Sequence, residues 1–388
     1  MNRVFPIGLL VWAAAGQVVL PMLPVPDEFN GDTYRIAKVH ALLRLTITCG
    51  AGGGCTSKEI MNWVSSIILR SFGHTFINMN ARESLAHKYY HKGVSLIGGW
   101  PALCNANDAG VVRWMWLEWN FSVDDAFSVE DFHVPAKLFN DGSVLWTWGA
   151  AALNANTTIN TATVTFWASV ERKNDVSIPA LIEIGSITGP SLQNQLPTGV
   201  YTDLFLLDPP AAAFAAANLT QVGIKARGED IHGSVPVDAV LSAYMSDHYK
   251  GITDNAGAAI GPWQDCAGTA WFVPLIWPSS CNNKNKVSQM VDCQGQPLLY
   301  DMRGTLTNPL FVYKRYLPQG QADAAKQLMA QGVTDVNALD VKMKTASKDA
   351  PKDATRTGMS ILPRKVTGAK SATALGGVVN RFTKTGVK

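Results

Sequence analysis

Charged side chains are scarce in this chain of 388 residues. Asp, Glu, Lys and Arg make up only 16% of it, whereas apolar residues make up 47%. A freely diffusing monomer of ordinary composition has about 25% charged residues. The deficit predicts that much of the surface is covered, most simply by other subunits. The net charge of +3 argues neither for nor against a nucleic-acid partner, and the length allows two domains with cores of their own.

Catalytic and cofactor signatures are also missing. The chain contains no GxSxG, no P-loop and no GxGxxG, which removes the nucleophile elbow and two nucleotide-binding motifs. Three polar clusters remain: the first is most simply a hairpin rim, the second would suit one metal ion if helical but has no third ligand nearby, and the third is most simply a solvated loop. They are ARGEDIH with Arg227, Glu229, Asp230 and His232, HKYYHKG with His87 and His91, and VDDAFSVEDFH with Asp124, Asp125, Glu130 and Asp131. We therefore expect no catalysis and no cofactor.

Metal-binding spacings are absent as well. The six cysteines form no CxxC pair and the histidines show no zinc-like spacing, so a metal site is not expected. Cys49 and Cys55 flank GAGGG and could bridge a turn, but the cysteine density favours free thiols.

Long apolar runs are lacking too. None reaches the roughly 20 residues that a membrane span requires. The first residues, MNRVFPIGLLVWAAAGQ, superficially resemble a signal peptide, but Pro6 interrupts the run and only one basic residue precedes it. Secretion is the less favoured interpretation.

Basic residues gather at the C-terminus. From Lys342 onward there are eleven Lys or Arg residues but only two acids, Asp349 and Asp353. A basic tail on a faintly acidic body indicates either an anionic surface as its neighbour or a solvated tail. These two interpretations stay open.

Strand patterns are what the chain has in abundance. YRIAKVHALLRLTIT alternates Ile36, Val39 and Leu42, then slips to Leu43, Leu45 and Ile47, which predicts a bulge. RWMWLEWNFSV places Trp114, Trp116 and Trp119 along one strand, where tryptophan is typical of a sandwich core or a subunit contact. A sugar-binding platform is the alternative for these residues.

Two stretches have the same layout. SSIILRSFGHTFINMN and TQVGIKARGEDIHGSV align on Gly73 and Gly228, an offset of 155 residues (228 minus 73). Together with many short strands and no βαβ alternation, they predict an all-β protein of two tandem eight-stranded antiparallel jelly rolls with short helices. The expected division is 1–28 as an N-terminal arm and first strand, 29–178 and 179–318 as the two jelly rolls, and 319–388 as a helical, then extended basic tail.

The predicted layout resembles a known family. QNQLPTGVYTDLFLLD and VDCQGQPLLYDMRGTLTNPLFVYKRY resemble the first and last strands of the second barrel of double jelly-roll major capsid proteins. These proteins belong to internal-membrane viruses of the tectivirus–adenovirus lineage. YRIAKVHALLRLTITCG and WVSSIILRSFGHTFINM resemble the opening strands of the first barrel. The resemblance covers most of Val19 to Pro318, and two departures from it are the apolar N-terminus and the long basic tail.

The resemblance implies a structural role in the virion. It implies a homotrimer that forms a pseudo-hexagonal capsomer, an icosahedral lattice assembled in the host cytoplasm, and minor capsid and vertex proteins as partners. It implies no sequence-specific nucleic-acid binding. It also puts the termini at the capsid base, so that a few basic residues of the tail would contact anionic lipid of an internal membrane. The candidates are Arg364, Lys365, Lys370, Arg381, Lys384 and Lys388.

Two other functions compete with this one. A secreted tandem jelly-roll protein that binds or processes carbohydrate would use the signal-like start, the tryptophan strands and the sequons at Asn120, Asn156 and Asn218. It predicts cleavage near Ala15 and stabilisation by sugar. A minor spike or vertex protein is a third possibility, and copy number in purified particles would distinguish it from a shell protein.

Overall fold

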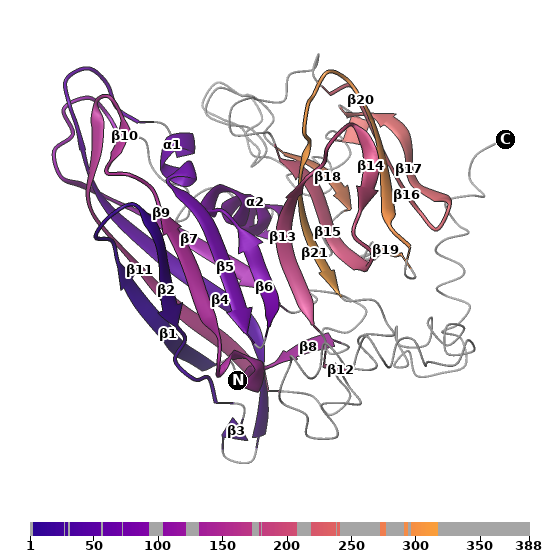
Figure 1. Cartoon of the computed structure of the whole chain (residues 1–388), viewed down its shortest axis with the longest axis horizontal. Coiled ribbons are helices and arrows are strands. Elements are labelled where there is room, and N and C mark those ends of the chain that lie inside the picture. Colours follow the sequence, from indigo (N-terminus) through magenta and orange to yellow (C-terminus); the bar gives the residue numbers. More distant parts are fainter. Residues whose placement is uncertain are drawn as a thin grey trace.

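The computed structural model describes the following parts of the chain: residues 3–26, 28–29, 32–55, 57–71, 73–92, 104–121, 132–172, 178–179, 181–207, 219–237, 239–240, 272–276, 291–293 and 296–316. These residues form two β-sandwiches side by side, the first indigo to magenta and the second pink to orange in Figure 1. The predicted all-β fold class is confirmed. Within these ranges, no helix combines the length and the apolar character that a bilayer crossing requires.

The first sandwich has two main sheets of four strands. One runs, in spatial order, β1 (Arg3–Val11), β11 (Thr157–Arg172), β4 (Asp32–Cys49) and β7 (Val111–Asn120). The other runs β2 (Gly16–Pro21), β9 (Ser143–Trp148), β5 (Val64–Ser71) and β6 (His74–Met79). The small elements around them are β3 (Glu28–Phe29), β8 (Phe132–Pro135), β10 (Ala152–Asn154), β12 (Ile178–Pro179), α1 (Ser57–Asn62), α2 (Ala81–Lys92) and the 3-10 turn η1 (Ala136–Phe139).

The second sandwich repeats this plan. One sheet runs β13 (Ile182–Thr188), β21 (Leu310–Tyr316), β15 (Val200–Leu207) and β18 (Phe272–Ile276), with β19 (Val291–Asp292) also paired to β15. The other runs β14 (Gln193–Leu196), β20 (Leu298–Arg303), β16 (Gln221–Ala226) and β17 (Glu229–Pro236).

Both sandwiches have jelly-roll topology. If the eight main strands of each are numbered along the chain, one sheet has the order first, eighth, third, sixth and the other second, seventh, fourth, fifth. This order is the same in the two halves. The fold is therefore a double jelly roll, as the sequence predicts.

The two aligned glycine stretches are the same hairpin in each barrel. Ser71 pairs with His74 around the turn at Gly73, and Ala226 pairs with Glu229 around the turn at Gly228. Both glycines have positive φ, 72° and 78° respectively, a backbone region in which a side chain would be strained. The layout that repeats in the sequence thus reflects a shared turn geometry.

A short parallel pairing joins the barrels. Ile184 and Gly185 of β13 pair with Ile77 and Asn78 of β6. As a result, one sheet continues from β2 through β9, β5, β6, β13, β21 and β15 to β18.

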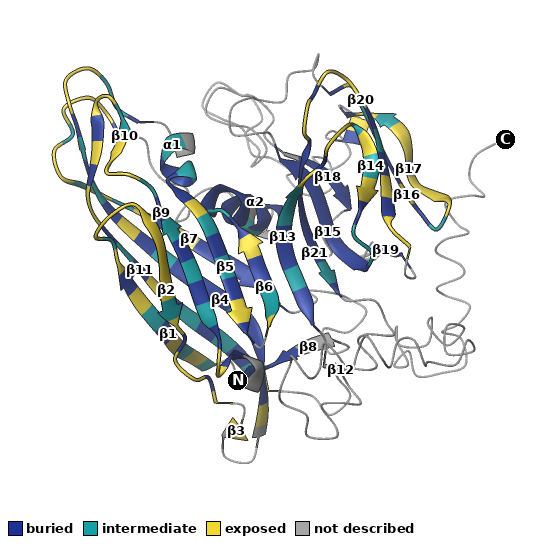
Figure 2. Ribbon diagram, viewed as in Figure 1, coloured by how far each residue is buried: buried dark blue, intermediate teal, exposed yellow. Residues whose placement is uncertain are grey.

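The sheet of β13, β21 and β15 separates two apolar cores and contributes side chains to both. Val200, Phe205 and Leu207 of β15 belong to the larger core, whereas Leu204 and Leu206 belong to the core of the second barrel. All eight residues of β15 are buried, and the strand is dark blue throughout in Figure 2. A strand covered on both faces loses the polar–apolar alternation of an exposed sheet, which explains the apolar run VYTDLFLL.

Three details differ from the expected strands. The irregularity in β4 lies at Ala37, because Ser169 pairs with Lys38 and Val170 with Ile36; the predicted slip at Leu42 is wrong. The stretch FHVPAKLF, whose pattern predicts one strand, is a strand only as far as Pro135 and continues as η1. Strands β1 and β2, within 1–28, pair with β11 and β9 of the first sandwich.

Candidate assembly surface

The outer face of the sheet β1-β11-β4-β7 exposes apolar and aromatic side chains. Along each strand, alternate residues point away from the core. The strand register brings Val11, Thr163, Arg44 and Trp114 into one row across this face, and Leu9, Thr165, Leu42 and Trp116 into the next. Trp114 is 44% exposed and Trp116 is 38% exposed. We call the outward residues Leu9, Val11, Val112, Trp114 and Trp116 the aromatic face.

Trp116 is held in place by its neighbours. Its indole nitrogen donates to Nδ1 of His40 over 3.3 Å, and the ammonium of Lys88 lies 4.8 Å from its ring centre. The His40 ring stacks on Trp167 at 5.2 Å and its Nε2 is 2.8 Å from the Ser169 hydroxyl. An aromatic side chain fixed in this way loses little conformational freedom when a partner covers it.

The neighbouring edge of the sandwich is apolar too. β2 is the outermost strand of the continuous sheet, and Val18 and Val19 on it, like Leu23 just beyond it, are exposed. An exposed apolar edge strand is a ready template for pairing with another chain. In a single copy, apolar groups therefore face solvent both on the aromatic face and along this edge.

Helix α2 links the two barrels at its N-terminus. Asn80 and Glu83 cap the helix reciprocally: the amide of Glu83 donates to Oδ1 of Asn80, and the amide of Asn80 donates to Oε2 of Glu83, each over 2.8 Å. The same carboxylate oxygen accepts a hydrogen bond from Ser186 of β13 over 2.8 Å. One side chain thus starts the helix and ties it to the second barrel.

Farther along α2, two more contacts reach β15. Nε2 of His87 is 3.0 Å from Oδ2 of Asp203, and both side chains are buried. The ring of Tyr90 stacks on Phe205 at 4.7 Å. Sequence reasoning treated His87 only as a possible metal ligand and missed this junction, because its partner lies 116 residues away along the chain.

Glu83 gives the junction a pH dependence. Burial raises the pKa of its carboxyl, although hydrogen bonds from Asn80 and Ser186 and the charge of Arg82 oppose the shift. The folded protein therefore holds this proton at pH values where the unfolded chain has released it, so stability falls as pH rises above the ordinary carboxyl range. We expect Glu83→Gln to flatten this part of a plot of unfolding free energy against pH.

Glu229→Gln, at the exposed start of β17, is the control. An unchanged slope for Glu83→Gln would contradict the assignment of the pH dependence to Glu83.

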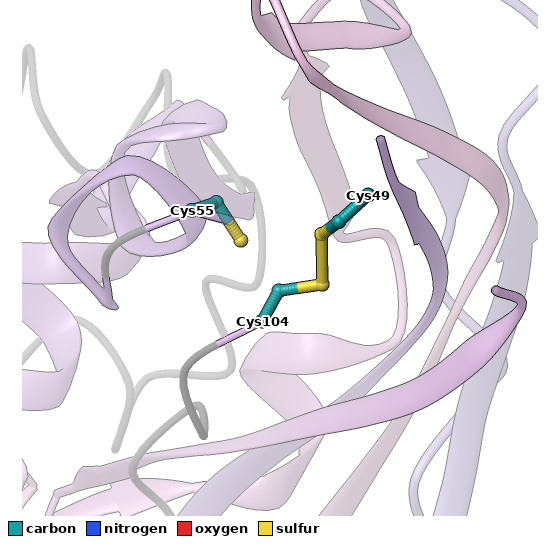
Figure 3. A group of neighbouring side chains, drawn as sticks. All are labelled: Cys49, Cys55 and Cys104. Atoms are coloured by element: carbon teal, nitrogen blue, oxygen red, sulfur yellow. A yellow bond between two sulfur atoms is a disulfide. The ribbon is translucent and has the colours of Figure 1, made fainter. Parts of the chain in front are cut away.

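Three cysteines meet at one end of the first barrel (Figure 3). Cys49, at the end of β4, and Cys104 form a disulfide, and all three sulfurs of Cys49, Cys55 and Cys104 lie within 4.8 Å of one another. The expectation of free thiols is wrong for Cys49 and Cys104, whereas Cys55 is a free thiol. The possible bridge from Cys49 to Cys55 is not the pairing seen. The sequence did not reveal this pair, because the partners are 55 positions apart along the chain.

The other predicted polar clusters have ordinary places or lie outside the described residues. Arg227 and Gly228 form the turn between β16 and β17, where Lys225 pairs with Asp230 over 3.1 Å, as expected for a hairpin rim. His232 lies in β17. The side chain of His91 and the residues Asp124, Asp125, Glu130 and Asp131 fall outside the described part. So do the six basic candidates for lipid contact, Arg364, Lys365, Lys370, Arg381, Lys384 and Lys388.

Comparison with known proteins identifies the fold. No family model and no curated protein sequence matches the chain. The crystal structure of the MCP, the major capsid protein, of STIV matches with a TM-score of 0.56 and 13% identity, over 82% of this chain and 97% of that one. A chain in the atomic structure of Sulfolobus Turreted Icosahedral Virus matches with a TM-score of 0.54 and 14% identity, over 89% of this chain and 99% of that one. The two-barrel fold described above is the one these structures share.

Proposed function

We propose that the protein is a major capsid protein whose copies build the shell of an icosahedral virus. The observation that carries this proposal is the pair of jelly rolls with identical strand order, joined side by side through β6 and β13. The similarity to the STIV structures extends over nearly the whole of those chains and supports it. The role is structural rather than catalytic.

The building block in this proposal is a homotrimer. Three copies with two similar barrels each place six near-equivalent units around a threefold axis, and closed symmetry satisfies the subunit contacts. The outline is then pseudo-hexagonal and can tile a facet. The exposed tryptophans of the aromatic face, and the low charge fraction of 16%, support a surface that neighbouring copies cover.

The remaining assignments extend the same proposal. The protein resides in the virion, is assembled in the host cytoplasm, and contacts minor capsid and vertex proteins. The proposed first barrel unit is 29–178 together with β1 and β2 of the segment 1–28, the second is 179–318, and 319–388 is the proposed tail. The basic residues of the tail contact anionic lipid of an internal membrane, each contributing roughly 1 kcal/mol near such a surface.

Size-exclusion chromatography with light scattering tests the proposal on the full chain. We expect a trimer of three 41.8 kDa subunits, or larger shells, at micromolar concentration. A strict monomer would contradict a capsomer. A monomer whose melting temperature rises with added glycans would instead support the carbohydrate-binding alternative, for which the exposed Trp114 and Trp116 rings are the candidate platform.

A further inference from the structure

The free thiol of Cys55 lies next to an existing disulfide. Its sulfur is within 4.8 Å of both sulfurs of the Cys49–Cys104 bond, and Figure 3 shows the Cys55 side chain pointing toward that bond. All three residues are buried, at 3–4% exposure. A thiolate that reaches a disulfide sulfur can replace one of its two partners.

The backbone fixes Cys55 opposite Cys104. The two residues form an isolated antiparallel β-bridge, and the amide of Cys55 donates to the carbonyl of Cys104 over 3.1 Å. Gly54 permits this approach, because a Cβ at that position would lie 1.6 Å from the same carbonyl oxygen. Directly opposite residues of an antiparallel pair have Cα atoms about 4.5–5.5 Å apart, within the range that disulfides span. Cys104 is therefore placed to bond either cysteine.

The surroundings of the Cys49 sulfur favour its release from Cys104 as a thiolate. The hydroxyl of Thr157 donates to Sγ of Cys49 over 3.7 Å. A donor at this position stabilises a sulfur that gains negative charge, and a better-stabilised leaving thiolate departs faster. No such donor is recorded on the Cys104 sulfur within the described residues.

We propose that the disulfide is exchangeable and that Cys55 is its second partner. The Cys55 thiolate attacks Sγ of Cys104; a Cys55–Cys104 bond forms while the Cys49–Cys104 bond breaks. Cys49 leaves as a thiolate and takes up a proton equivalent to the one that Cys55 released. Because one disulfide and one thiol are present before and after, the step consumes no oxidant or reductant.

The exchange moves the cross-link without removing it. In one form Cys104 is tied to Cys49 at the end of β4, and in the other to Cys55, two residues before α1. Burial raises the pKa of the Cys55 thiol, so only a small fraction is thiolate near neutral pH and the two forms interconvert slowly. Acid protonates the thiolates and stops the exchange, so that both disulfide forms can be analysed.

Disulfide mapping of the full chain tests the proposal. Wild type and the variants Cys49→Ser and Cys55→Ser are equilibrated in a buffer of reduced and oxidised glutathione, quenched with acid and digested with pepsin. Because GAGGG keeps Cys49 and Cys55 on one peptide, tandem mass spectrometry with backbone fragmentation between them identifies which of the two carries the Cys104 peptide. We expect both linkages in the wild type, a Cys55–Cys104 peptide in Cys49→Ser, and only the Cys49–Cys104 peptide in Cys55→Ser. Cys293→Ser, at a buried cysteine of the second core, is the matched control and should leave both linkages as in the wild type.

A further variant tests the role of the hydroxyl. Thr157→Val keeps the side-chain shape, and it should slow the exchange, followed by acid quenching at successive times after glutathione is added, about fivefold, as expected for loss of one hydrogen bond to the leaving thiolate. The proposal is overturned if Cys49→Ser holds Cys55 and Cys104 as free thiols under conditions that oxidise Cys55→Ser. The wild type provides a test that does not depend on how the variants fold. If only the Cys49–Cys104 linkage is found in the wild type, the proposal is also overturned. None of these readouts depends on assembly, so failure here leaves the capsid proposal unaffected.

Discussion

Replacing Asp203 by alanine is expected to lower the free energy of unfolding by about 3–5 kcal/mol, the range for breaking a buried charged pair from one side. The Asp203 carboxylate is only 2% exposed and lies 3.0 Å from the His87 ring. Its register partner on β21 is Lys314, which is also buried, at 1% exposure. Removing the carboxylate takes away one buried partner of the His87 imidazole.

Urea unfolding of the wild type and the variant measures this effect. Asp230→Ala is the matched control, because its ion pair with Lys225 is about half exposed and should contribute less than about 1 kcal/mol. A double-mutant cycle with His87→Ala isolates the pair, and we expect a coupling energy above about 1 kcal/mol. If Asp203→Ala lowers the free energy of unfolding no more than Asp230→Ala does, the contact between His87 of α2 and Asp203 of β15 does not hold the barrels together.

The double variant Trp114→Ala/Trp116→Ala is expected to weaken assembly at least about 100-fold. Buried tryptophans at interface centres often contribute 2 kcal/mol or more each, and every 1.4 kcal/mol is tenfold in affinity. In a single copy these rings are 44% and 38% exposed. Their loss should therefore change the stability of the subunit much less than its association.

Light scattering over a dilution series measures the shift from trimer to monomer. Leu299→Ala is the control: Leu299 is an apolar side chain of similar exposure, 44%, on β20 of the second barrel. Circular dichroism must show that the double variant is folded. Assembly unchanged at all concentrations would remove the aromatic face from the subunit contact and direct attention to the exposed edge along β2.

The repeated hairpin and the strand content were accessible from sequence because both depend on local rules. A glycine at positive φ between two apolar alternations is visible in one stretch of chain, as at Gly73 and Gly228. The bulge in β4 was misplaced because its position depends on pairing with β11, which starts more than 100 residues later. Local alternation gives the presence of an irregularity but not the partner that determines where it lies.

The contacts that join distant segments were not accessible in the same way. Cys104 and Asp203 carry no local signature of their partners, which lie 55 and 116 residues away. The alternation along β7 puts Trp114 and Trp116 on the face opposite to Trp119, but it does not show which of the two faces the opposite sheet and α2 cover. The low charge fraction predicts that part of the surface is covered by other copies, but it does not identify which part of the surface that is.

The continuous sheet through β6 and β13 has a mechanical consequence. Backbone hydrogen bonds cross from one barrel to the other, and α2 fastens the same boundary from one side. A subunit built this way resists bending between its halves. In a closed shell of such subunits, the change of angle from one facet to the next would have to occur at the contacts between molecules, because each molecule keeps its own shape.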